Sequence, residues 1–183
     1  MRYGFTCVAG VLALASGILM AAELNVGPAT KSTVVATFKQ EGVTVDSPFT
    51  RFAGKISYDP QNVGASRATI EVETASLDIG DPAYNAEVAK KSWFDSATYP
   101  KGVFNSTAIK PLAANRFEAA GTLTIKGKAQ TISIPVTVGV TPAGNVFDGS
   151  FAISRKAFGI GDASWDDVLA DQVVVKFHFV GGR

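Results

Sequence analysis

Apolar and polar residues alternate with a period of two along most of the chain, which predicts β-strands with one buried and one exposed face. In segment 67–75, Ala68, Ile70, Val72 and Thr74 point to one side, and charged or polar residues mostly point to the other. Longer segments at 116–126 and 130–140 alternate in the same way. Their apolar sets are Phe117, Ala119, Gly121, Leu123 and Ile125, and Ile132, Ile134, Val136, Val138 and Val140. Further strands are predicted over 32–42, 49–58, 102–110, 147–155 and 172–180.

Turn-forming residues join several of these strands, at 59–62, 110–112, 127–129 and 142–145. One segment breaks the strand pattern, because residues 82–91 are rich in helix formers. Asp81 suits the N-cap of this helix and Pro82 its first position. An aromatic loop that contains Trp93 and Phe94 follows the helix. About eight strands with one short helix are typical of an all-β sandwich or barrel, not of a fold that alternates strands and helices.

The N-terminal segment has the features of a secretory signal peptide. Arg2 is followed by an apolar run over 7–14 and then by small residues up to Ala22. We expect cleavage near Ala22, with cleavage after Gly17 or a retained anchor as alternatives. The run is marginal as a membrane span, which needs about 20 mainly apolar residues. The sequence therefore predicts a signal peptide over 1–22 and one domain over 23–183, located in the periplasm or secreted, with no stable membrane span.

Charge and composition exclude several classes of protein. The chain has 17 Lys and Arg against 16 Asp and Glu, with one His and one Cys. This balance gives no basic surface for nucleic acid. A single Cys, which lies in the predicted leader, excludes a disulfide framework, and with a single His it also excludes a zinc cluster. We expect no cofactor, no metal and no catalytic residue.

Two groups of polar residues are weaker candidates for a functional site. Acidic residues surround Trp165 at positions 162, 166, 167 and 171, and such oxygen ligands suit a hard cation. Their spacing matches no calcium-binding loop, so we interpret them as a solvated turn. His178 alternates out of phase with Phe177 and Phe179, which places it on the outer face and disfavours a Ser–His–Asp arrangement.

Several short motifs occur in a characteristic order along the chain. They are Phe52-Ala53-Gly54-Lys55-Ile56-Ser57-Tyr58-Asp59, Trp93-Phe94-Asp95, Tyr99-Pro100, Gly121-Thr122-Leu123-Thr124-Ile125-Lys126-Gly127 and Ser154-Arg155-Lys156-Ala157-Phe158-Gly159-Ile160. Together they resemble the YceI-like family of secreted, lipocalin-like, polyisoprenoid-binding bacterial proteins. The resemblance implies an eight-stranded antiparallel barrel that holds a long-chain isoprenoid, quinone or fatty-acid-like amphiphile.

The alternation and the resemblance together define a set of candidate ligand-binding residues. The predicted set is Phe52, Ile70, Val72, Trp93, Phe94, Phe104, Leu123, Ile125, Ile134, Val136, Phe151, Arg155, Phe158 and Phe177. Trp93, Phe94 and Tyr99 could form a lid, or anchor their loop on the barrel. Arg155 could meet a ligand head group, or pair with an acid and cap carbonyl groups.

Two alternative functions remain open at this point, and the oligomeric state is open as well. A solid barrel filled by its own side chains would serve as a protein-interaction module, because a filled and a hollow barrel show the same alternation. A hydrolase or redox partner that acts on a bound lipid is a further alternative. Homodimer formation is compatible with the sequence.

Overall fold

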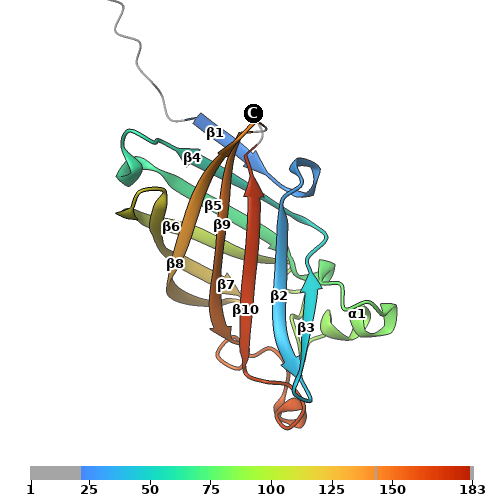
Figure 1. Cartoon of the computed structure of the whole chain (residues 1–183). Helices are drawn as coiled ribbons and strands as arrows, with labels where there is room; N and C mark the ends of the chain where they lie inside the picture. The colour runs from blue at the N-terminus through green and yellow to red at the C-terminus, as the bar shows by residue number, and fades with distance from the viewer. Residues whose placement is uncertain (1–21, 143, 182–183) are drawn as a thin grey trace, which may run out of the picture.

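The protein is a single, strongly curled antiparallel β-sheet with one short α-helix (Figure 1). The computed structural model describes residues 22–142 and 144–181. The ten strands are β1 (Ala22–Val26), β2 (Thr33–Gln40), β3 (Val43–Pro48), β4 (Phe52–Tyr58), β5 (Arg67–Glu73), β6 (Lys101–Ala113), β7 (Arg116–Ile125), β8 (Lys128–Thr141), β9 (Gly144–Ser154) and β10 (Gln172–Val180). The helix α1 (Pro82–Val88) and four short 3-10 helices complete the fold. The predicted leader over 1–22 lies almost entirely outside the described residues.

The predicted count of eight strands is wrong. The sheet has ten, in the order β1-β4-β5-β6-β7-β8-β9-β10-β2-β3, so β1 and β3 stand at its two ends instead of closing a ring. β1 and β3 are the two strands that the sequence pattern does not predict. β1 pairs with β4, and β3 pairs with β2. Pattern analysis missed both, because β1 overlaps the predicted leader and the exposed residues of β3 obscure its alternation.

The predicted alternation holds in the strands that enclose the interior. In β7 the residues Phe117, Ala119, Gly121 and Leu123 are buried, as expected, and their neighbours are less buried. In β8 the apolar set faces the same way, except that Val140 is 84% exposed near the strand's end. The cause is position, since Val140 pairs with Asn145 close to the β8–β9 turn, beyond the core.

The turns differ from prediction in detail. β6 continues through Pro111, which was expected to lie in a join, and a register shift in its pairing with β7 accommodates this residue. The β7–β8 turn consists of Lys126 and Gly127, one residue earlier than predicted. Both have positive φ, 49° and 70°, as a two-residue hairpin turn with right-handed twist requires.

The predicted helix is confirmed, although it ends at Val88 and not at Lys91. The Asp81 carboxylate accepts hydrogen bonds from the backbone N–H groups of Ala83 at 2.7 Å and Tyr84 at 3.4 Å. This N-cap satisfies donors that have no partner within the helix. The segment that carries α1 joins β5 to β6 and stands at one end of the sheet (Figure 1). A backbone hydrogen bond from Asp78 to Pro48 ties this segment to the end of β3.

The described part of the chain contains no helix with the length and apolar character needed to span a bilayer.

Candidate functional site

A cavity of about 560 Å³ lies inside the curled sheet. Inward-facing side chains from β2 to β10 line it, together with residues of α1 and of the loops at the same end. Cavities of roughly 300–1,000 Å³ are typical of small-molecule sites. The interior is therefore not filled by its own side chains, which removes the basis for a solid barrel.

Most of the predicted binding residues line this cavity. Those that do are Ile70, Val72, Trp93, Phe94, Phe104, Leu123, Ile125, Ile134, Val136, Phe151, Arg155 and Phe177. They come from strands that are distant in sequence, and the period-two alternation brings them to one interior. Their contact with a ligand remains a prediction.

Two predicted residues lie in the packed wall behind the cavity. Phe52 on β4 is buried, and its ring lies 6.2 Å from that of Phe179. Phe158 is fully buried in the cluster that also contains Trp93 and Ile160. Alternation indicates which side of the sheet a residue faces, but it does not distinguish a side chain that borders a void from one that is covered.

Sequence reasoning missed several lining residues, and some of them had a readable signal. Tyr58 and Ile56 continue the inward face of β4, and Tyr84 and Val88 stand one helical turn apart on α1. Trp165 is predicted to lie in a solvated turn, because acidic residues surround it. It instead lines the cavity, and its ring lies 5.1 Å from that of Trp93 in a T-shaped arrangement.

The cavity opens beside α1. Among its lining residues, those that are exposed to solvent are Gln40, Gly80, Asp81 and Tyr84. Gln40 is the last residue of β2, and the other three lie at or just before α1. Lining residues near the β4–β5 and β6–β7 joins, such as Ser66 and Phe117, are buried. A ligand would therefore enter between the β2–β3 turn and α1, which we call the mouth.

The aromatic loop after α1 closes part of this end from within. Trp93 and Phe94 line the cavity, and the Phe94 ring packs edge-on against Phe49 at 6.2 Å. Tyr99 does not line the cavity but lies against Gly127 of the β7–β8 turn. Trp93 and Phe94 thus line the cavity near the mouth, and Tyr99 packs against the β7–β8 turn, which fixes the loop in place.

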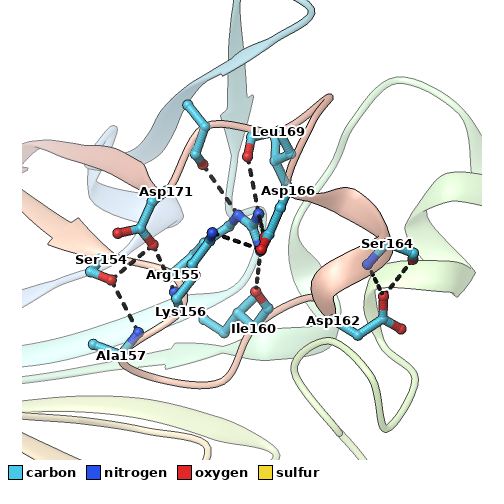
Figure 2. Close-up of polar contacts among 11 residues, drawn as sticks. Ser154, Arg155, Lys156, Ala157, Ile160, Asp162, Ser164, Asp166, Leu169 and Asp171 are labelled. Atoms are coloured by element: carbon cyan, nitrogen blue, oxygen red, sulfur yellow. Dashed lines mark hydrogen bonds and ion pairs between the residues drawn. The ribbon is translucent and has the colours of Figure 1, made fainter.

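Arg155 is the polar centre of the loop that connects β9 to β10 (Figure 2). Its guanidinium is buried and donates to the carbonyl oxygens of Ile160 at 3.1 Å, Leu169 at 3.0 Å and Ala170 at 3.2 Å. It also pairs with the Asp166 carboxylate at 2.9 Å. Of the two predicted roles, the structure therefore shows Arg155 as a residue that pairs with an acid and caps carbonyl groups.

The acidic residues near Trp165 bind protein groups. Hydrogen bonds from Lys156 and Arg155 lower the pKa of Asp166, against the opposing effect of burial. The Lys156 backbone N–H and the Ser154 hydroxyl do the same for the pKa of Asp171. Asp162 accepts from the N–H of Ser164. In the described part of the chain, His, Cys, Asp and Glu side chains form no group of three that could hold a metal ion.

His178 does not belong to the cavity. Its Nδ1 lies 2.7 Å from Asp148, the residue opposite it on β9, and its side chain is 45% exposed. This is the outer-face position that the alternation predicts.

Comparison with known proteins identifies the family. A model of the YceI-like domain matches residues 26–181. The chain belongs to the YceI-like domain family. A curated relative, a UPF0312 protein of Vibrio cholerae, is 30% identical over 129 residues, which are 66% of this chain and 68% of the relative.

Solved structures with a similar fold include BcnA of Burkholderia cenocepacia. It has a TM-score of 0.78 and 42% identity, over 81% of this chain and 95% of BcnA. A domain from Saccharophagus degradans, described as polyisoprenoid binding and implicated in plant cell wall breakdown, has a TM-score of 0.69 at 17% identity. That match covers 86% of this chain and 97% of the domain, and it shows the YceI-like fold alone.

Proposed function

We propose that this YceI-like protein is a carrier that holds a long-chain isoprenoid, quinone or fatty-acid-like amphiphile in its cavity and catalyses no reaction on it. The observation that carries this proposal is the 560 Å³ cavity with its lining of aliphatic and aromatic side chains. Such a lining lets an apolar tail be buried away from water. It provides few hydrogen-bond partners for a polar ligand.

The energetics favour a long tail over a small apolar molecule. Removing apolar surface from water stabilises a complex by roughly 25 cal/mol per Å². Association costs on the order of 10 kcal/mol in lost translational and rotational freedom. A ligand must therefore bury roughly 400 Å² of apolar surface before net binding begins. An extended hydrocarbon chain exceeds this area by a wider margin than a single ring does, and is therefore expected to bind more tightly.

Two further points support the proposal. The Saccharophagus degradans domain, which shares the fold, is described as polyisoprenoid binding. His178, the only histidine of the chain, lies outside the cavity and pairs with Asp148. The imidazole of His178 therefore does not face the proposed ligand.

We also propose that the protein works in the periplasm or is secreted, after removal of residues 1–22. The basic start, apolar run and small-residue end of this segment support the proposal. A carrier in that compartment would shelter a hydrocarbon tail during passage through water.

Native mass spectrometry of the full-length gene product tests both parts. We expect protein with a bound lipid that organic extraction removes, and a polypeptide mass that lacks the leader. Ala68 lines the cavity on β5, so Ala68→Phe should lower lipid occupancy by placing a ring in the ligand's space. Ala53 is exposed on the outer face of β4, so Ala53→Phe serves as the matched control. Protein without lipid from several expression hosts would contradict the carrier function.

A further inference from the structure

We infer that the cavity selects amphiphiles with an uncharged head group, such as a prenol or a quinone, over those with a phosphate or carboxylate. This inference rests on the proposed carrier function and narrows its ligand class. It follows from the charges around the cavity and its mouth.

Among the described residues that line the cavity, no cationic side chain is free to bind an anionic head group. Among the described residues that line it, three carry a formal charge: Asp81, Glu87 and Arg155. Two of these are carboxylates at the mouth, and they would repel an anionic head group. Binding sites for phosphate or carboxylate groups normally present Arg, Lys or a run of backbone N–H groups.

Arg155 is already committed to the protein. Its guanidinium donates four hydrogen bonds, three to carbonyl oxygens and one to Asp166, and it is 2% exposed. A ligand phosphate would have to displace Asp166, which Lys156 also holds at 2.8 Å. Such an exchange would break the charge-assisted hydrogen bond between Arg155 and Asp166 and would carry a charged phosphate out of water into an apolar cavity, which is costly.

The segment beside the mouth is acidic. Asp78, Asp81 and Glu87 lie within ten residues, and Lys90 pairs with Glu87 at 2.5 Å. Hydrogen bonds from Asn85 and from the Gly80 N–H lower the pKa of Asp78, so its carboxylate stays ionised at neutral pH. On the other side of the mouth, Lys39 and Glu41 flank Gln40 with opposite charges. With Lys91 counted, residues 78–91 carry three carboxylates and two ammonium groups, so the local net charge at the α1 side is −1.

Uncharged polar groups are present at the mouth and at the far end. The Gln40 amide and the Tyr84 hydroxyl both border the opening, where they can exchange hydrogen bonds with a hydroxyl or a carbonyl group. Near the β4–β5 join, burial raises the pKa of Tyr58, so its phenol also stays neutral. Apart from Arg155, the polar side chains among the described residues that line the cavity are therefore neutral or negative.

The test compares two probes that share one tail, geranylgeraniol and geranylgeranyl phosphate, on delipidated protein. Both tryptophans of the chain line the cavity, so intrinsic fluorescence reports its occupancy directly. We expect the alcohol to bind at least tenfold more tightly at low ionic strength, and added salt to narrow this difference by screening the mouth. Salt would not narrow a difference caused by the size of the phosphate.

Charge-neutral variants provide the second readout. Asp81→Asn combined with Glu87→Gln should reduce the preference for the alcohol over the phosphate about tenfold, and Asn preserves the N-cap of α1. Glu118→Gln, a change of the same kind on β7 away from the cavity, should leave this preference unchanged. Equal affinity of the wild type for both probes would overturn the inference and leave the carrier function intact. Failure of both probes to bind would instead count against the carrier function.

Discussion

Arg155 organises the loop that closes one end of the cavity. The loop from residue 156 to residue 171 has little regular structure, so its carbonyl groups depend on side-chain donors. One guanidinium serves three of them and an acid, within a cluster that contains Phe158 and Ile160. The sequence suggested this role as one of two alternatives for Arg155, but it could not identify which carbonyl groups would surround the guanidinium.

Replacing Arg155 by Met should therefore destabilise the protein severely. The change leaves buried carbonyl oxygens without donors, and we expect it to lower the free energy of unfolding by about 3–5 kcal/mol, as the loss of one partner of a buried pair does. Lys156→Met is the matched control, because Lys156 pairs with the same Asp166 from an exposed position and should matter far less. Urea denaturation measures both variants. Equal stability of the two variants would show that the buried bonds contribute nothing.

The strands show how far alternation predicts an element and where it stops. Strands β5, β7 and β8 follow the expected inward and outward faces, because each has a continuous apolar side to bury. β3 was missed because most of its residues are exposed, so burial imposes little pattern on it. Its pairing with β2 comes from tertiary contact, which is a property of the sheet and cannot be read from the strand alone.

Close packing between strands β6 and β7 depends on a glycine. A Cβ atom at Gly121 would lie 2.6 Å from the ring of Phe104, and closer still to the backbone oxygen of Asn105. Gly121→Ala should therefore force β6 or the Phe104 ring to move, at a cost of about 1–3 kcal/mol in unfolding free energy. Gly139 on β8 has no atom within 4 Å of the same position, so Gly139→Ala should change stability by less than about 0.5 kcal/mol. Equal effects in chemical denaturation would refute this account.

The whole molecule is a curled sheet built around a void, and the void is the feature that sequence patterns could not predict. The same alternation would result if Phe104, Phe151 and Phe177 met at the centre and filled it. Whether they meet depends on the curvature of the sheet and on side-chain directions across several strands. The sequence predicts the aromatic loop, the helix and the spacing that puts Tyr84 and Val88 on one helical face. Only the fold shows that these residues surround the opening of the cavity.

An empty apolar cavity of this size should make stability depend on occupancy. Ligand at 100 times its dissociation constant stabilises the folded state by about 2.7 kcal/mol, which corresponds to a rise of ~5–10 °C in melting temperature for a protein of this length. We therefore expect delipidated protein to melt lower than protein saturated with geranylgeraniol, in differential scanning calorimetry. The shift should persist in Ala53→Phe and shrink in Ala68→Phe, since only the second variant places a ring in the cavity. A shift of the same size in both variants would mean that the alcohol binds outside the sheet.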